Sequence, residues 1–341
     1  MKKIAIFILI IITLLGSHSM KAQFDSQLSN YWAAMGYFNP ASIAQTDSLD
    51  ILAINRMQWV GMTHAPVTMV VLAGMPYQLF GRKHGFGVSM YNDKQGLFSS
   101  NVISGQYSYK LKMKKGELGI GIQGGYITET FDGSKIKIPK GDDEFDPHDE
   151  AIPGSEVSGN SIDASLGVFY SNKKLYAGLS VTHLLSPKLE LNENSVMEIP
   201  RSYYFTAGYN IQLNNPLLEL RPSILVKTME LSSFYLEADT LVPVTKENTL
   251  KGMLKQTQLD ISMRMIYNNT FWGGISWRKQ DAVVVMLGGK FKMIEVGYSY
   301  DYPISDIIKE SWGSHEIFLR YTVDVSKKKS NKNKHKSVRI L

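Results

Sequence analysis

The chain has 341 residues, of which 44% are hydrophobic and 20% are charged, so it is long enough for one large domain or two small ones. This composition excludes a disordered chain, and the absence of cysteine excludes disulfides, thiolate zinc sites, iron–sulfur clusters and a cysteine nucleophile. The net charge of +6 comes from the two ends, because the body between residues 23 and 325 carries about −4. A nucleic-acid-binding domain is therefore disfavoured, since its basic residues should lie on the fold itself.

The first segment, residues 1–22, has the pattern of a secretory signal peptide. Lys2 and Lys3 precede an apolar core at residues 4–15, which is too short to span a bilayer as a helix. The small and polar residues that follow predict cleavage after Ala22, and no Cys follows, as a lipoprotein would require. We therefore expect a chain that leaves the cytoplasm.

Residues 23–49 precede the first predicted strand, and we expect them to form an N-terminal segment in the periplasm. Asn39-Pro40 within this segment is interpreted as a turn before the first strand, because Pro blocks the continuation of a helix.

The body that follows, residues 50–325, alternates between apolar and polar side chains with a period of two. No apolar run in it reaches the length of a transmembrane helix. The polar face keeps ionisable groups in mid-strand, which is typical of a water-filled barrel lumen: Asp163, Asp260, Arg264, Glu295 and Arg320. A closed barrel satisfies every backbone group in lipid, whereas an open sheet does not.

Fourteen strands are predicted in this body, an even number, as bacterial outer-membrane barrels require. Connections after the even-numbered strands are short, and the four long connections all follow odd-numbered strands. The sequence therefore predicts an all-β fold, a transmembrane antiparallel outer-membrane β-barrel of about 14 strands with both termini in the periplasm. The predicted strands lie near 50–60, 66–77, 84–92, 98–112, 116–131, 160–171, 174–183, 201–213, 218–228, 256–267, 271–279, 282–290, 293–301 and 314–323.

Two charged stretches lie outside these strands. Six carboxylates surround His148 in the connection 132–159, where they would bind calcium or form a solvated acidic loop. The basic C-terminal tail, residues 326–341, carries seven Lys or Arg and no acid. It would contact anionic lipid, peptidoglycan or an acidic periplasmic partner, or serve only as a solubilising tail.

No residue is identified as catalytic, cofactor-binding or metal-binding, no cofactor is expected, and the chain is not expected to be an enzyme. The histidines are scattered without metal-ligand spacing, and neither G-x-S-x-G nor a Walker loop is present. Ser314, His315 and Glu316 resemble part of a hydrolase set, but adjacent strand residues point to opposite faces. The glycines within residues 119–125 fit barrel curvature or packing.

Two sets of side chains have structural interpretations. Trp59, Trp272 and Trp277 suit the aromatic girdle at the membrane interface. Arg56 and Arg278 are expected to pair in the lumen with acidic residues, for which the candidates are Asp163, Asp260 and Asp301.

Several short stretches, taken in order over residues 23–323, resemble the PorP/SprF family of the type IX secretion system in Bacteroidetes. None is specific alone; the ordered set is. Its main members are Gln23-Phe24, Asn39-Pro40-Ala41, Arg56-Met57-Gln58-Trp59-Val60-Gly61, Gly85-Phe86-Gly87-Val88, Leu118-Gly119-Ile120-Gly121, Gly167-Val168-Phe169-Tyr170, Tyr176-Ala177-Gly178-Leu179-Ser180, Trp272-Gly273-Gly274-Ile275-Ser276-Trp277-Arg278, Gly297-Tyr298-Ser299-Tyr300-Asp301 and Gly313-Ser314-His315-Glu316.

The resemblance implies a non-catalytic integral protein of the outer membrane that acts by protein–protein contact in secretion or in anchoring cargo at the cell surface. The implied partners are periplasmic lipoproteins and ring components of the secretion machine, together with secreted cargo or surface adhesins that include gliding adhesins. The basic tail is not part of the family pattern. The main alternative is an outer-membrane channel or transporter for small or lipophilic solutes; an outer-membrane enzyme and pure adhesion through the long loops are further alternatives.

Overall fold

The fold was analysed in a computed structural model, which describes residues 25–45, 47–136, 154–192, 195–231, 234–237, 240–243, 249, 252–253 and 256–325. Fourteen antiparallel strands form a closed barrel, in which each strand pairs with its neighbours along the chain. The first strand pairs with the last, and this pairing closes the barrel. Among the described residues, no helix is long and apolar enough to cross a membrane.

All fourteen predicted strands are present, with boundaries that differ by a few residues. The short β11 (Ile211–Gln212) continues β10 along the same partner, β12. The barrel strands are β1 (Ser48–Met57), β2 (Val67–Leu79), β3 (Arg82–Gln95), β4 (Phe98–Met113), β5 (Gly116–Asp132), β6 (Glu156–Ser171), β7 (Leu175–Thr182), β10 (Ser202–Tyr209), β12 (Leu218–Met229), β15 (Gln258–Tyr267), β16 (Phe271–Arg278), β17 (Ala282–Phe291), β18 (Ile294–Pro303) and β19 (Ser314–Asp324).

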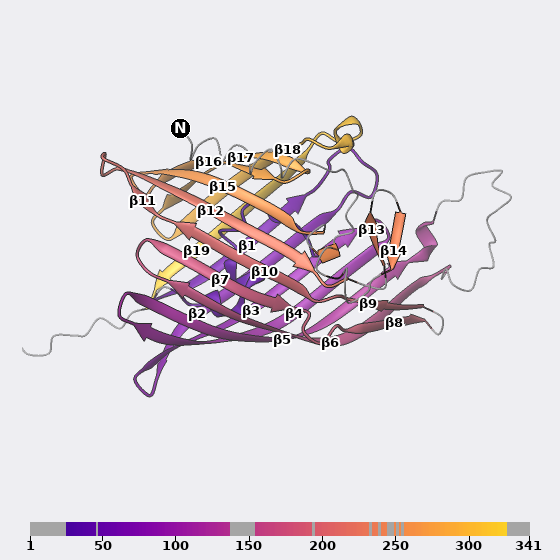
Figure 1. The fold of residues 1–341 in the computed structure, drawn as a ribbon, viewed down its shortest axis with the longest axis horizontal. Helices are drawn as coiled ribbons and strands as arrows, with labels where there is room; N and C mark the ends of the chain where they lie inside the picture. The colour runs from indigo at the N-terminus through magenta and orange to yellow at the C-terminus, as the bar shows by residue number, and fades with distance from the viewer. Residues whose placement is uncertain are drawn as a thin grey trace, which may run out of the picture.

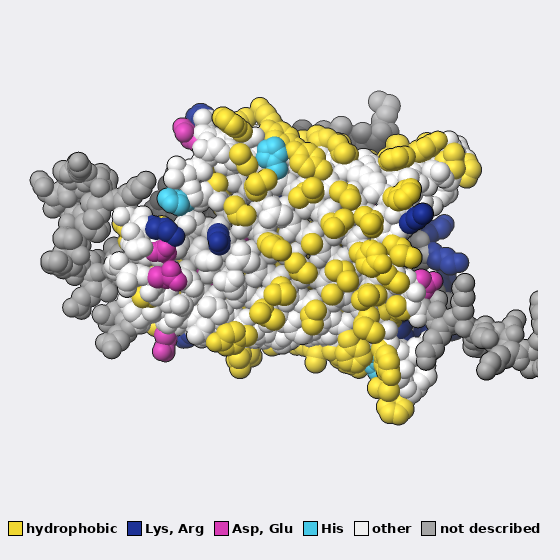
Figure 2. Space-filling view, turned by 180° about the vertical axis from the view of Figure 1, so that it is seen from behind, with side chains coloured by type: hydrophobic (Ala, Val, Ile, Leu, Met, Phe, Trp, Pro, Cys, Tyr) yellow, Lys and Arg dark blue, Asp and Glu magenta, His cyan; other side chains and the backbone are white. Residues whose placement is uncertain are grey.

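The barrel wall is apolar outside and polar inside, the reverse of a soluble sheet. Along β15 the side chains of Asp260, Ser262 and Arg264 are buried, whereas the intervening Ile261 and Met263 are exposed. Hydrophobic side chains cover the side of the barrel between two rims where charged side chains gather (Figure 2). This arrangement is what a lipid-facing barrel requires, because only the outer face meets hydrocarbon.

The two ends of the barrel differ as the sequence predicts. One end, the short-turn end, carries only tight connections together with the start of β1 and the end of β19. At this end Phe80 and Gly81 form a two-residue hairpin turn with positive φ angles of 50° and 73°, the combination that matches the twist of paired strands. The other, the long-connection end, carries the two extra hairpins, β8 (Lys188–Asn192) with β9 (Ser195–Glu198) and β13 (Phe234–Glu237) with β14 (Thr240–Pro243) (Figure 1).

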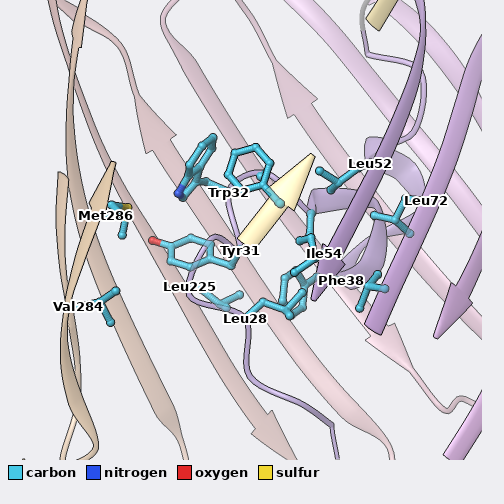
Figure 3. Packing of buried hydrophobic residues seen from close by; sticks show 14 of the residues in the cluster. Leu28, Tyr31, Trp32, Phe38, Leu52, Ile54, Leu72, Leu225, Val284 and Met286 are labelled. Atoms are coloured by element: carbon cyan, nitrogen blue, oxygen red, sulfur yellow. The ribbon is translucent and has the colours of Figure 1, made fainter. Parts of the chain in front are cut away.

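The N-terminal segment lies inside the barrel, which differs from the expectation of a separate periplasmic segment at residues 23–49. Residues 25–45, called the plug from here on, contain the one-turn helix α2 (Met35–Phe38) and the 3-10 turn η1 (Pro40–Ser42). Its apolar side chains pack against inward-facing apolar residues of the wall (Figure 3). The plug contributes Leu28, Tyr31, Trp32, Ala33, Ala34 and Phe38 to this core, and the wall contributes Leu52, Ile54, Val70, Leu72, Tyr204, Leu225, Ile266, Trp272, Val284, Met286 and Phe318.

The expectation for Trp272 is wrong, because its side chain points into the lumen. Its ring stacks on Phe318 with ring centroids 6.0 Å apart and meets the plug residue Trp32 edge-on at 5.0 Å. Trp277, five positions later in the same strand, is half-buried on the opposite, outward side. Trp59 is half-buried in the connection between β1 and β2.

Candidate functional site in the barrel lumen

The plug turn at Asn39-Pro40-Ala41 is pressed against the inner wall. The side-chain oxygen of Asn39 accepts a hydrogen bond from the Ala41 amide at 2.9 Å, and Pro40 begins the 3-10 turn as the motif predicts. The Asn39 amide group then donates to two wall carbonyls, Val168 at 3.0 Å and Leu179 at 3.1 Å. The side chain of Asn39 therefore holds the plug to β6 and β7.

Glycines on the wall make this close approach possible. A Cβ atom at Gly121 would lie 2.2 Å from the Ala41 nitrogen, and one at Gly167 would lie 2.1 Å from the Asn39 side-chain oxygen. No side chain fits at such distances. The packing interpretation of the 119–125 glycines is confirmed for Gly121, whereas nothing lies within 4 Å of a Cβ at Gly124.

A buried ionic network supports the other part of the plug. Arg56 contacts Asp301 at 2.8 Å and Glu316 at 3.4 Å, while Arg278 contacts Asp260 at 3.0 Å and Asp301 at 3.1 Å. These five residues come from β1, β15, β16, β18 and β19, and all five are buried. Of the predicted acidic partners, Asp301 pairs with both arginines, and Asp260 pairs with Arg278.

The plug completes this network with its own backbone. The amides of Ser29 and Asn30 donate to the two oxygens of Glu316, each at 2.8 Å. The Ser29 hydroxyl donates to Asp301 at 2.7 Å and accepts from Arg56 at 2.8 Å. The carboxylates of Glu316 and Asp301 and the Ser29 hydroxyl thus gain hydrogen-bond partners, which is the condition under which burial of charge is tolerated.

The first described residue of the plug, Asp25, forms a separate cluster with His183. The two His183 ring nitrogens lie 2.9 Å from Asp25 and 2.8 Å from Asp163, so Asp163 pairs with a histidine rather than with an arginine as expected. Tyr204 also donates to Asp25. Burial opposes the charged form of His183, but the Asp25 carboxylate beside it raises the pKa of His183 to about 10. The imidazolium form therefore bridges the plug to the wall.

The residues Ser314, His315 and Glu316 do not form one site. Glu316 points into the lumen network, whereas His315 lies on the outward side and its Nδ1 is 2.7 Å from the hydroxyl of Tyr298. The expectation that adjacent strand residues cannot build a triad is confirmed. Within the described part of the chain, no group of three or more His, Asp or Glu could hold a metal ion. The acidic residues 142–150 and the tail 326–341 lie outside the described residues.

A cavity of about 620 Å³ lies between the plug and the short-turn end of the barrel. Plug residues Trp32, Ala33 and Met35 line it on one side, and the turn residues Asn172 and Asn269 line it on the other. At the opposite end of the barrel, the β8–β9 hairpin covers part of the inner wall, because Leu189 and Ile199 pack on the buried Ile127.

The plug is the main feature that the sequence reasoning missed. Residues 25–45 carry a signal that would have indicated burial, a cluster of apolar and aromatic side chains without strand alternation. The buried ring and guanidinium pair of Trp32 and Arg264, with 3.4 Å between the guanidinium carbon and the ring centroid, was also missed because it joins distant segments.

One known family matches most of the chain. A family model described as "Type IX secretion system membrane protein PorP/SprF" matches residues 20–321. No curated protein matches the chain.

Three solved structures match the chain with low sequence identity and TM-scores below 0.5. A FadL homologue from Pseudomonas aeruginosa is 12% identical, with 89% of this chain and all of that chain covered and a TM-score of 0.47. The toluene transporter TodX from Pseudomonas putida is 11% identical, with 92% and 97% covered and a TM-score of 0.43. BamA from Haemophilus ducreyi is 8% identical, with 81% and 70% covered and a TM-score of 0.43.

Proposed function

Because the chain belongs to the PorP/SprF family of type IX secretion system membrane proteins, we propose that it serves this machine by protein–protein contact. In this proposal the chain handles or anchors secreted cargo, gliding adhesins among them, at the long-connection end. Periplasmic lipoproteins and ring components bind at the short-turn end, and the signal peptide is removed after Ala22. The family and the fold are those of a secretion or transport barrel of the outer membrane.

The observation that carries the proposal is the filled lumen. The plug lies across the barrel interior and is held there by the ionic network, by the Asn39 turn and by the His183 cluster. With the plug across the lumen, the protein acts through the two ends of the barrel. The hairpins at the long-connection end give that rim a folded surface larger than strand connections alone would provide.

The proposed function is tested by comparing the proteins of the culture fluid and the cell surface between a parent strain and a clean deletion. Loss of many secreted proteins identifies a general component of the machine. Loss of one large surface protein identifies a dedicated cargo anchor. If neither fraction changes and no paralogue compensates, the secretion proposal fails.

The channel alternative is tested separately with the purified barrel in planar bilayers. A steady ion current through the unmodified protein would favour the channel. The secretion proposal instead expects current only after the plug is displaced.

A further inference from the structure

The cavity at the short-turn end contains a buried arginine that has no acidic partner. Arg56 and Arg278, the two arginines of the ionic network, each contact at least two carboxylates. Arg264 is 94% buried, yet among the described residues no carboxylate lies within ion-pair distance of it and its Nε has no hydrogen-bond partner. Its guanidinium only covers the ring of Trp32. Burial of a charge without a partner costs free energy, so binding of an anion beside Arg264 would be favourable.

The register of the sheet places a second cation beside the first. Arg221 on β12 lies directly opposite Arg264 on β15, and both side chains line the cavity. Like charges that face each other across two strands destabilise a sheet. Arg221 has one carboxylate partner, Glu219 at 2.8 Å, which leaves the pair with an excess positive charge.

The unpaired polar atoms of the cavity wall are donors. The indole nitrogens of Trp32 and Trp272 and the amide nitrogen of Gln45 are buried and have no hydrogen-bond partner among the described residues. All three side chains line the cavity together with Arg264. Cations outnumber carboxylates among the side chains that line the cavity, so the site matches a ligand that carries negative charge. The cations are Arg221, Arg264, Lys290 and Arg320, and the carboxylates are Asp50 and Glu295.

The size and the remaining walls of the cavity indicate more than a small inorganic ion. Its volume of about 620 Å³ is in the range of sites that hold drug-sized ligands. Leu52, Leu72 and Ile266 add apolar surface to the same wall. Such a mixed site accommodates a peptide segment that has both acidic and apolar side chains.

The chain's own C-terminal tail is excluded as the occupant by its charge. It follows Val325 at the same end of the barrel, but it carries seven Lys or Arg and no acid, so the arginine pair repels it. The same tail attracts an acidic partner toward this end.

We infer that the cavity at the short-turn end binds a carboxylate-bearing, partly apolar peptide segment of a partner protein, with Arg264 and Arg221 as the groups that hold the carboxylate. The inference deepens the proposed function and rests on it for the orientation that brings a periplasmic partner to this end. The binding itself is measurable on the purified chain, so its failure and the failure of the secretion proposal are distinguishable.

The test uses the purified mature chain in detergent and two fluorescein-labelled peptides, one of alternating Glu and Leu and one of alternating Gln and Leu. Fluorescence anisotropy is expected to show tighter binding of the Glu–Leu peptide. Arg264→Gln should weaken that binding about tenfold or more, because a charge-assisted hydrogen-bond pair is lost. Arg82→Gln removes the same charge from an exposed position at the same end of the barrel, outside the cavity, and should leave the affinity unchanged.

Two further measurements keep the inference falsifiable if Arg264→Gln does not fold. Arg221→Gln should weaken binding as well, and raising the salt from about 0.1 M to about 1 M should remove most of the preference for the Glu–Leu peptide. Equal affinity for the two peptides, or loss of binding in Arg82→Gln to the same extent, overturns the inference. Displacement of the Glu–Leu peptide by inorganic phosphate at matching concentration assigns the site to small anions and overturns the peptide assignment.

Discussion

Two of the places where the plug meets the barrel are held by different kinds of interaction. At Ser29 and Asn30, backbone amides and a hydroxyl are held by buried carboxylates, which are themselves held by arginines. At Asn39-Pro40-Ala41, backbone lies directly on glycines, and the contact depends on the absence of a side chain. The first anchor, the ionic anchor, therefore depends on charge balance, and removal of a charge should break it. The second, the steric anchor, depends on volume, and an added side chain should break it.

The ionic anchor should give the largest effect when it is broken. Arg56→Met removes one cation and leaves Asp301 and Glu316 with less compensation inside the lumen. We expect a loss of about 3–5 kcal/mol in the free energy of unfolding, measured by urea unfolding of the reconstituted barrel with tryptophan fluorescence. Arg82→Met is the matched control because Arg82 is exposed. Equal losses in the two variants would contradict the ionic anchor.

Breaking the contact at Asn39-Pro40-Ala41, the steric anchor, should release the plug with a smaller loss in the free energy of unfolding. Gly121→Ala places a methyl group on the Ala41 nitrogen, and we expect a loss of about 1–3 kcal/mol in the same measurement. The chain has no cysteine, so Ser42→Cys provides a single buried thiol that reports on the plug. Its labelling by a maleimide should become faster in the Gly121→Ala background.

The control for the steric anchor lies in the same strand. Gly124→Ala adds the same methyl group where nothing lies within 4 Å, so neither stability nor labelling should change. Faster labelling in both backgrounds would mean that the effect comes from the strand and not from contact with the plug.

The hydrogen bonds of Asn39 contribute to the same anchor without changing its volume much. Asn39→Ala removes the turn contact to Ala41 and the two bonds to wall carbonyls. We expect a loss of about 1–2 kcal/mol by urea unfolding. Asn92→Ala serves as the comparison, since Asn92 bonds Asn101 in an exposed pair. A loss no larger than that of Asn92→Ala would contradict a role for Asn39 in holding the plug.

The His183 cluster differs from both anchors because its contribution to stability depends on pH. The pKa of His183 in the folded protein, about 10, lies above its ordinary value of 6.5. Its contribution to stability is thus complete below about pH 6.5 and is lost as the pH rises through about 10. The urea midpoint of the parent should fall over this range more than that of His183→Gln. Parallel pH profiles for the two proteins would exclude the histidine as the cause.

The sequence predicted the wall far better than it predicted the contents of the barrel. Period-two alternation is a local property, so all fourteen strands and the difference between the two ends were accessible from it. The pairing of Arg56 and Arg278 with lumenal acids followed from the same alternation. The position of the plug did not, because it depends on contacts such as Asn39 with Val168, which are 129 residues apart.

Trp272 shows that part of the error was avoidable. Trp272 and Trp277 are five positions apart, so a strand places them on opposite faces and both cannot belong to an outer girdle. Trp272 shares its face with Arg278, six positions later, which was already expected in the lumen. Consistent use of that parity would have placed an aromatic ring inside the barrel and indicated a packed interior.

The contact between Glu316 and the plug also fixes an order of assembly. Glu316 lies on β19, the last strand to leave the ribosome, whereas Ser29 and Asn30 come 287 and 286 positions earlier. Since β19 also closes the cylinder against β1, the plug gains its carboxylate anchor only when insertion is complete. A chain that ends before β19 lacks both the strand pairing that closes the barrel and the Glu316 carboxylate that binds the plug. In such a chain Trp32 also lacks the ring of Phe318, so an unfinished molecule exposes apolar surface that the finished one buries.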